Sequence, residues 1–593
     1  MFCPKNLFAA ALIFASSLSL TSAEVVCHDE TFVPDAILRI TEAPLAQSCL
    51  PSKPTVLVNG TSPGPALRLK EGTRYWIRVY NDMSDKNLTM HWHGLSMATS
   101  PFSDGTPLAS QWPIPPSKFF DYEILPPTGM AGTYFYHSHV GFQAVSATGP
   151  LIVTETEPPY KYDAEKIVFL QDVFTKNDST IEKGLVSSPL QWSGETSMIL
   201  VNGKGAGSAN GTSCNASLAG INVEPGKTYR LRFIGGTALS LVSLAIEGHN
   251  MTVIEADGSY TEPHNTSFLQ IGSGQRYSVL LHTNPTPEKK VYYMQLETRE
   301  RPTLTRSFAV LNYGTPSTPT DFLPPNPATI PLTLPNITRG FLDYELSPHH
   351  ANTHMATMPT ADQVTRTIVL TVHQKVDGRT TWVQNSYPWT EDVPKEPYLV
   401  SLYKNNATNF PSMERALANN GIDPETRTFP AQIGEVLEIV IQNTGADKGG
   451  LDGHPFHAHG AHYWDLGAGN GTYNATQNNE YWASNSTGQP IKRDTTMLYR
   501  YASTTQNGTA MGWRAWRIEV TQPGVWMVHC HILQHMIMGM QTVWVMGNAS
   551  EVMMVDEPEV EGYLTYGGDV LGDENSWPSV VEVMSGDDWT KGQ

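Results

Sequence analysis

Three segments of the chain share one pattern, in which a glycine comes before apolar and polar residues in strict alternation. They begin at Gly72 (GTRYWIRVYN), Gly226 (GKTYRLRFIG) and Gly434 (GEVLEIVIQN). Alternation with a period of two is typical of a β-strand with one buried face, and a preceding glycine is typical of a turn. We therefore expect each segment to be a turn that leads into a half-buried strand, and three copies predict three β-sandwich units.

A second repeat relates only the first and the last of these units. The segment GTYFYHSHVG from Gly132 resembles GVWMVHCHIL from Gly524, and each precedes another apolar strand. A Pro- and Thr-rich stretch between the second and third units favours neither a helix nor a central strand. The predicted units are domain 1 (24–155), domain 2 (156–318), a linker (319–365), domain 3 (366–555) and a C-terminal tail (556–593).

The composition agrees with folded, turn-rich β domains. Hydrophobic residues make up 40% of the 593 residues and charged residues only 16%, which excludes a disordered chain. Glycine (48) and proline (43) are frequent, and this favours an all-β protein over long helices. The formal net charge of -19 repels phosphate backbones. We therefore expect no nucleic-acid partner.

The N-terminus has the features of a secretory signal. Lys5 precedes an apolar run from Leu7 to Leu20, and the small residues Thr21-Ser22-Ala23 follow it. We interpret residues 1–23 as a cleaved signal peptide, because the run is too short to span a bilayer. The sequence contains no later run of about 20 apolar residues, so we expect no membrane anchor. About fourteen N-x-S/T sequons agree with a glycoprotein that is secreted, or held in a secretory-pathway vesicle or the cell wall.

Four cysteines remain after the signal peptide with Cys3 is removed: Cys27, Cys49, Cys214 and Cys530. An oxidising compartment is expected to pair two of the first three in a disulfide bond, and the sequence leaves all three pairings open. Cys530 lies between two histidines and needs a different explanation.

Ten of the 19 histidines fall into four short motifs. They are HWHG (His91, His93), HSH (His137, His139), HPFHAHG (His454, His457, His459) and HCHILQH (His529, His531, His535). In a strand, a His-x-His pair points both imidazoles to one face. One such pair is usually a structural feature, but four pairs, two in domain 1 and two in domain 3, predict that eight imidazoles converge on one metal cluster.

The fourth motif indicates which metal this is. His529 and His531 face one way in a strand, so Cys530 faces the other way, toward a second site. Cys530 can combine there with His454 and His535 to give the two-histidine, one-thiolate set of a blue copper centre, with Met540 as a weak axial ligand. A structural zinc site would not explain a separate cluster of eight histidines. Four coppers in the two sites would hold the four electrons that reduce dioxygen to water.

These four motifs, in this order, resemble the signatures of the multicopper oxidases, and the match covers nearly the whole mature chain. The resemblance implies an all-β protein of three consecutive cupredoxin-like Greek-key β-sandwich domains, similar to the laccase and ascorbate oxidase branch. It implies one type 1 copper at His454, Cys530, His535 and Met540, and a type 2 copper at His91 and His457. It also implies a type 3 pair at His93, His137, His139, His459, His529 and His531.

The resemblance also implies roles beyond the ligands. Asp104 matches an acidic residue that assists proton delivery in laccases, and Leu533 stands where many relatives carry a second acid. The implied function is a secreted laccase-like oxidase, similar to fungal enzymes, that takes electrons from small phenols and reduces dioxygen. In some relatives this reaction couples phenols in pigment or secondary-metabolite biosynthesis. Ascorbate oxidase, ferroxidase and a non-catalytic copper-binding cell-wall protein are the alternatives. We expect a monomer.

Overall fold

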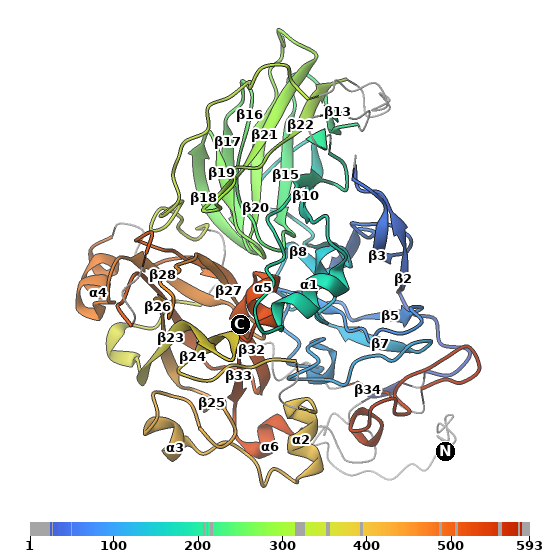
Figure 1. Cartoon of the computed structure of the whole chain (residues 1–593), viewed down its shortest axis with the longest axis vertical. Helices are drawn as coiled ribbons and strands as arrows, with labels where there is room; N and C mark the ends of the chain where they lie inside the picture. Colours follow the sequence, from blue (N-terminus) through green and yellow to red (C-terminus); the bar gives the residue numbers. More distant parts are fainter. Residues whose placement is uncertain are drawn as a thin grey trace, which may run out of the picture.

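The computed structural model describes the chain from Glu24 to Val583 with short gaps (Figure 1). The gaps are Cys27, Cys49, 206–207, 210–211, 214–216, 315–325, 351–355, 392–394, 486–488, 505–507, 555–559 and 579–580. The predicted signal peptide and the cysteines at 27, 49 and 214 lie outside the described residues. The signal peptide and the disulfide bond among these cysteines therefore stay predictions.

Domain 1 is a sandwich of two four-stranded sheets, with strand orders β3-β2-β5-β7 and β4-β9-β8-β6. Its strands are β2 (Ala36–Leu45), β3 (Lys53–Val58), β4 (Leu67–Lys70), β5 (Tyr75–Asn81), β6 (His91–His93), β7 (Phe119–Ile124), β8 (Gly132–His137) and β9 (Thr148–Thr154). β6 and β8, which carry the first two histidine motifs, pair antiparallel in the same sheet.

Domain 2 has a six-stranded sheet (β11-β10-β15-β20-β17-β18) and a five-stranded sheet (β14-β22-β21-β16-β19), drawn in green in Figure 1. The strands are β10 (Ala164–Val173), β11 (Met198–Val201), β14 (Ala219–Val223), β15 (Thr228–Gly235), β16 (Leu241–Ile246), β17 (Met251–Ala256), β18 (Ser259–Thr266), β19 (Leu269–Ile271), β20 (Arg276–His282), β21 (Val291–Arg299) and β22 (Arg306–Tyr313). Residues 326–350, from the predicted linker, form no helix or strand and pack Phe341, Leu342 and Leu346 onto the domain 2 core.

Domain 3 repeats the arrangement, with sheets ordered β24-β23-β26-β31-β28-β29 and β25-β33-β32-β27-β30. The strands are β23 (Arg366–Asp377), β24 (Arg379–Gln384), β25 (Thr428–Ala431), β26 (Val436–Ala446), β27 (His454–Ala458), β28 (Tyr463–Gly469), β29 (Lys492–Arg493), β30 (Thr495–Leu498), β31 (Trp513–Glu519), β32 (Gly524–Cys530) and β33 (Gln541–Met546). The predicted all-β fold is confirmed.

Short elements complete the described chain. The helices are α1 (Asp178–Leu185), α2 (Tyr398–Lys404), α3 (Met413–Leu417), α4 (Ala475–Ser484), α5 (Leu533–Ile537) and α6 (Ala549–Val552), with 3-10 turns at Pro101–Ser103, Gln143–Val145, Ala361–Gln363 and Glu561–Tyr563. Small strand pairs join β1 (Glu24–Val26) to β34 (Val581–Val583) and β12 (Ser208–Ala209) to β13 (Thr212–Ser213). Within the described residues, no helix is long and apolar enough to cross a membrane.

The three repeated segments form β5, β15 and β26, and the glycine before each has a positive φ of 67°, 68° and 88°. Glycine adopts this backbone conformation without the strain that a Cβ would add, so the predicted turns are confirmed. The prediction of half-buried strands is wrong. The polar positions Arg230 and Glu438 are also buried, because each forms an ion pair with another strand of the same sheet, to Glu255 and Arg517. Buried charges are tolerated when they are paired in this way.

One apolar core spans domains 1 and 3. Trp92 and Tyr136 of domain 1 belong to the same buried cluster as Phe456 and Trp526 of domain 3, whereas the main core of domain 2 is a separate cluster. The strands that carry the histidine motifs lie where these two domains meet, near the centre of Figure 1. The shared core therefore fixes the motifs of domain 1 against those of domain 3.

Candidate metal centres

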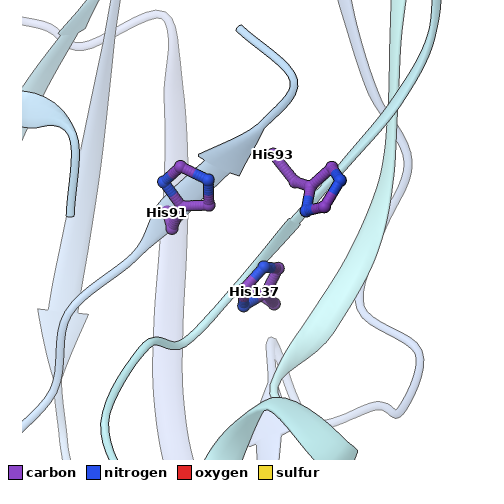
Figure 2. A group of neighbouring side chains, drawn as sticks. All are labelled: His91, His93 and His137. Carbon is purple, nitrogen blue, oxygen red and sulfur yellow. The ribbon is translucent and has the colours of Figure 1, made fainter. Parts of the chain in front are cut away.

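Domain 1 brings four histidines together through one strand pair. His91 and His93 lie on β6, and His137 lies opposite His91 on β8 (Figure 2). Because side chains alternate along a strand, His91 and His93 project from the same face. His139 lies two residues beyond the end of β8. The sequence pattern thus predicts correctly that His91 and His93 share a face. In the HSH motif only His137 lies in the strand, because His139 comes after its end.

Domain 3 repeats the geometry. β27 pairs antiparallel with β32 and places His457 opposite His529, while His459 and His531 follow just beyond the strand ends. His454 at the start of β27 and Cys530 at the end of β32 lie on the opposite side from these imidazoles, as the alternation predicts.

The two domains bring their imidazoles into direct contact. The rings of His91 and His459 stack with centroids 3.9 Å apart, and those of His93 and His457 stack at 3.7 Å. All eight imidazoles of this group are at most 3% exposed. We call them the eight-histidine cluster: His91, His93, His137, His139, His457, His459, His529 and His531.

Acceptors behind the cluster hold one nitrogen of most of its rings. The Nδ1 atoms of His91, His137, His457 and His529 donate to the backbone carbonyls of Asp104, Ser138, Asp494 and Cys530 at 2.6 to 3.0 Å. His459 Nδ1 donates to the Asp104 carboxylate at 3.0 Å. A carbonyl or carboxylate only accepts, so each contact places the ring proton on Nδ1 and leaves Nε2 with a free lone pair.

The free nitrogens converge on the middle of the cluster. His459 Nε2 and His529 Nε2 are 3.1 Å apart, and so are His93 Nδ1 and His531 Nε2. The Nε2 atoms of His91, His137 and His457 are buried without a hydrogen-bond partner among the described residues. Lone pairs facing one another at this distance repel, and unpartnered buried nitrogens are costly. Both features fit metal cations held between the rings.

Burial also keeps these imidazoles in the form that binds metal. It lowers the pKa of His137 to about 4 and that of His529 to about 3, because water no longer stabilises the charged ring. A neutral imidazole retains the lone pair that a cation needs. The ligand nitrogens are therefore available at neutral pH without first losing a proton.

The second predicted site lies behind the cluster on β32. Cys530 Sγ is 3.8 Å from His454 Nδ1 and 3.7 Å from His535 Nδ1, and these two nitrogens are 3.1 Å apart. All three side chains are buried. Met540 is also fully buried, and its backbone bonds to those of Cys530 and His535. A sulfur and two imidazole nitrogens this close together form the trigonal set that suits a blue copper ion.

Two buried carboxylates border the eight-histidine cluster. Asp104, the predicted acid, accepts from His459 Nδ1, and its second oxygen lies 3.7 Å from His91 Nδ1. Burial raises the pKa of Asp104. Asp494 accepts from His93 Nε2 at 3.2 Å and lies 3.5 Å from His457 Nδ1. Burial would raise the pKa of Asp494, but the charge of Arg276 and the hydrogen bonds from neighbouring histidines together outweigh it and hold the pKa well below its usual range.

Sequence reasoning missed Asp494 and its domain 2 partner Arg276, whose guanidinium binds both Asp494 oxygens at 2.6 Å. It also missed Ser273, whose hydroxyl lies 2.8 Å from His531 Nδ1. The one local signal was the segment GSGQR from Gly272, which has the glycine spacing of a close backbone approach. Domain 2, which carries none of the four histidine motifs, thus contacts the cluster directly.

A small pocket of about 20 Å³ lies beside the Cys530 site. Asp452, Gly453 and Pro455, on either side of His454, form part of its wall. Asp452 Oδ2 lies 3.6 Å from His535 Nε2 and also bonds to Arg301 at 3.1 Å. Arg301 in turn holds Glu195. The outward edge of His535 therefore borders a polar rim in which Arg301 is paired with two acids.

Comparison with known proteins agrees with this geometry. Three family models described as multicopper oxidase match residues 39–158, 164–316 and 392–550. Laccase-like multicopper oxidase 1 of Thermothelomyces thermophilus is 45% identical, over 97% of this chain and 96% of its own length. The chain belongs to the multicopper oxidases. Multicopper oxidase aurL2 of Gibberella zeae is 46% identical, over 95% of this chain and 97% of its own.

More distant multicopper oxidases extend the comparison. L-ascorbate oxidase of Nicotiana tabacum is 32% identical, over 83% of this chain and 86% of its own. The solved structure of the laccase from Botrytis aclada superposes with a TM-score of 0.68 at 22% identity, over 89% of this chain and 90% of that one. Fet3p, a multicopper oxidase that functions in iron import, gives 0.67 at 24% identity, over 86% and 90%. These structural matches support the cupredoxin-like architecture.

This multicopper oxidase is therefore a copper-dependent oxidoreductase, laccase-like and related to the ascorbate oxidases. Copper is the cofactor that the family uses, and the two buried ligand groups are compatible with copper sites. The resemblance expected from the four histidine motifs, the cupredoxin-like fold and the copper cofactor are confirmed.

Proposed function

We propose that this multicopper oxidase is a secreted laccase-like enzyme that oxidises phenols by one electron at a time and reduces dioxygen to water. Copper, when bound, supplies the electron transfer and the four-electron reduction of dioxygen. The observation that carries the proposal is the convergence of lone pairs in the eight-histidine cluster, next to a separate Cys530 site on the same strand. Coupling of the resulting phenoxyl radicals into pigments or secondary metabolites is one use of this chemistry.

We assign four coppers to the chain. His454, Cys530 and His535 hold the type 1 copper with Met540 as a weak axial ligand, and His91 and His457 hold the type 2 copper. The type 3 pair is held by the remaining histidines of the cluster: His93, His137, His139, His459, His529 and His531. His139, His459 and His529 lie close enough together to share one ion, and this supports their place in the type 3 pair.

The backbone of β32 provides the route between the two sites. His529 and His531 are the direct neighbours of Cys530, and His529 Nδ1 donates to the Cys530 carbonyl at 3.0 Å. An electron that leaves the Cys530 sulfur therefore reaches either cluster histidine through a few covalent bonds, or through one hydrogen bond. This short connection between a site beside a pocket and a fully buried site is what the proposed reaction needs.

Asp104 is the proposed proton-delivery residue. It is fully buried, it accepts from the cluster ligand His459, and Thr106 donates to the same oxygen at 3.0 Å. Dioxygen reduction consumes four protons inside a site that the surrounding protein closes to water. A carboxyl held against a ligand ring is placed to pass those protons inward.

The rim of the Cys530 site favours an organic substrate over ferrous iron. A divalent cation is bound by several free carboxylates. Here Glu195 and Asp452 are both paired with Arg301, and the positive charge of Arg301 disfavours the binding of ferrous iron beside it. Asp452 remains within 3.6 Å of His535 Nε2, where it can accept a hydrogen bond from a phenolic hydroxyl. Small phenols and dioxygen are the proposed partners, and the monomer is the proposed state.

Ascorbate is the second candidate substrate. Relatives named L-ascorbate oxidase are 30 to 32% identical over 83% of this chain. Arg299, Arg301 and Arg500 line the same pocket, and guanidinium groups attract an anion such as ascorbate. The phenol and ascorbate proposals differ in which reductant gives the higher kcat/KM.

Oxygen uptake by the purified, copper-loaded protein tests the proposal. A panel of phenols, ascorbate and ferrous iron is offered at equal concentrations, and hydrogen peroxide is assayed as a by-product. We expect the highest kcat/KM with a phenol and no peroxide. A higher kcat/KM with ascorbate or ferrous iron would replace the substrate assignment, and peroxide as the main product would contradict the four-electron cluster.

Replacement of the thiolate ligand provides a second test, on copper itself. Cys530→Ser is expected to abolish the blue thiolate absorption while most of the copper in the eight-histidine cluster stays bound, because only the Cys530 site loses a ligand. Copper per chain and the visible spectrum are measured together. A variant that stays blue would show that the thiolate assignment is wrong.

A further inference from the structure

Domain 2 supplies none of the proposed copper ligands, yet one of its turns enters the ligand cluster. This turn runs from Gly272 to Gln275 between β19 and β20, and Arg276 is the first residue of β20. Gly274 in its middle has a φ of 86°, and a Cβ there would lie 3.0 Å from His93 Cε1 and 3.1 Å from His531 Cδ2. The turn is thus packed against two rings of the cluster, one from each of the other domains.

Ser273 of this turn holds His531 through a directed chain of hydrogen bonds. The Ser273 hydroxyl donates to the backbone carbonyl of Thr237, also in domain 2. Its oxygen then accepts from His531 Nδ1 at 2.8 Å. Because the hydroxyl proton is used by Thr237, the proton on the imidazole must be at Nδ1, and Nε2 keeps its lone pair. Ser273 is 1% exposed, so no bulk water replaces it.

Arg276 holds the other ring through Asp494. Its two terminal nitrogens donate to the two Asp494 oxygens at 2.6 Å each, and Nε donates to the Thr133 carbonyl at 2.9 Å. Asp494 then accepts from His93 Nε2 at 3.2 Å. A fork of two parallel hydrogen bonds fixes the plane of a carboxylate as well as its charge. His93 is therefore oriented with Nε2 toward Asp494 and Nδ1 toward the cluster.

The two rings held in this way form one of the pairs whose metal-facing nitrogens approach each other. His93 Nδ1 and His531 Nε2 are 3.1 Å apart, although the residues lie 438 positions apart in the chain. His93 comes from domain 1 and His531 from domain 3, so neither domain alone can set the distance between them. The turn of domain 2 contacts both rings from behind.

We infer that Ser273 and Arg276 are positioning residues that fix His93 and His531 for one copper of the cluster. This inference rests on the proposed function, because it requires that the cluster binds copper. Partners behind a metal ligand typically account for a factor of 10 to 100 in metal affinity. Domain 2 thus takes part in the assembly of the copper cluster, beyond separating the two ligand-bearing domains.

The test compares copper retention in matched variants of domain 2. Ser273→Ala removes the acceptor behind His531, and Ser273→Thr keeps the hydroxyl. Ser243→Ala is the control, because Ser243 is also a fully buried serine of domain 2, hydrogen-bonded to Gln270 and not to any cluster residue. Each purified holoenzyme is titrated with a copper chelator, and copper per chain is measured together with the blue absorption of the Cys530 site.

We expect Ser273→Ala to lose cluster copper at a chelator concentration about 10 to 100 times lower than wild type, with the blue absorption unchanged. Ser273→Thr and Ser243→Ala should retain copper as wild type does. Arg276→Lys, which keeps the charge and loses the fork, should lose cluster copper as Ser273→Ala does. If Ser273→Ala and Arg276→Lys both retain copper like the control, the inference is overturned. A wild-type protein that holds no cluster copper would instead overturn the proposed function.

Discussion

The carboxylate of Asp104 has two oxygens in different surroundings. Oδ2 accepts from His459 and Thr106, whereas Oδ1 has no hydrogen-bond partner among the described residues and lies 3.7 Å from His91 Nδ1. A buried carboxylate oxygen without a hydrogen-bond partner lowers the stability of the fold, so its presence calls for a functional explanation. Proton transfer beside the cluster is such an explanation, and the apolar, buried Leu533 cannot take part in it.

Asp104→Asn is expected to slow reoxidation of the reduced enzyme by dioxygen by roughly 10²-fold, since an amide cannot pass on a proton. Electron uptake from a phenol should not change, because the Cys530 site is untouched. Stopped-flow measurement of reduction and reoxidation separates the two steps. Reoxidation at the wild-type rate across the pH range would show that Asp104 has only a structural role.

Met540, the proposed axial ligand, is expected to affect a different property, the reduction potential of the Cys530 site. A thioether sulfur is a weak ligand that stabilises the oxidised copper, so its removal raises the potential. Met540→Leu keeps the volume and the apolar character of this fully buried position. We expect a higher potential by redox titration and faster oxidation of phenols that wild type oxidises slowly. An unchanged or lower potential would show that Met540 is not the axial ligand.

Neighbouring strands of domain 2 carry a network of buried charges that faces domain 1. Glu255 on β17 binds Arg230 of β15 and Ser278 of β20, and it accepts from the backbone N–H of Thr133 in domain 1 at 2.6 Å. Burial by itself would raise the pKa of Glu255, but the charges of Arg230 and Arg232 outweigh it and lower the pKa to about 2. The network therefore stabilises the fold only while Glu255 is ionised.

This network predicts how stability depends on pH. Because the folded pKa of about 2 is below the unfolded value, the contribution of Glu255 is complete above about pH 4.5 and is lost as the pH falls toward 2. Its size is roughly 3 kcal/mol, from 1.36 kcal/mol for each unit of pKa difference. Chemical unfolding of wild type and Glu255→Gln between pH 5 and 2.5 measures it. The Glu255→Gln substitution should lower stability at pH 5 and flatten the pH dependence, and equal slopes would exclude this role.

The whole molecule is held together at the cluster, because domains 1 and 3 contribute four imidazoles each. Their apolar residues also form one continuous core. Copper bound between the two domains stabilises their association by mass action, by about 2.7 kcal/mol when free copper is 100 times its Kd. The apoprotein therefore keeps its core and its hydrogen bonds between the domains but lacks the metal–ligand bonds that would cross the interface.

Removal of copper by a chelator is expected to lower the unfolding temperature and to separate the unfolding of domain 2 from that of domains 1 and 3. Calorimetry of the holoprotein, the apoprotein and the reconstituted protein measures both effects. Addition of copper back to the apoprotein should restore the original transition. A holoprotein and an apoprotein with identical transitions would show that the cluster does not hold the domains together.

The sequence by itself determined the features that depend on local periodicity. Strands with a period of two and glycines at turns indicate three β-sandwiches, and the His-x-His spacing alone places paired imidazoles on one face of a strand. Each metal site gathers a residue type that is uncommon elsewhere in the chain. The proposed ligands could therefore be named from their motifs, and the structure brings the eight-histidine cluster and the Cys530 group together as predicted.

Only the tertiary structure decided what lies behind these ligands. Ser273, Arg276 and Asp494 belong to common residue types, and they meet His531 and His93 only after three domains have packed together. The buried polar faces of β15 and β26, predicted to be exposed, were also decided by tertiary contacts, in their case by ion pairs within the same sheet. A strand pattern specifies which side chains share a face, whereas the partner of that face is set by contacts between residues hundreds of positions apart.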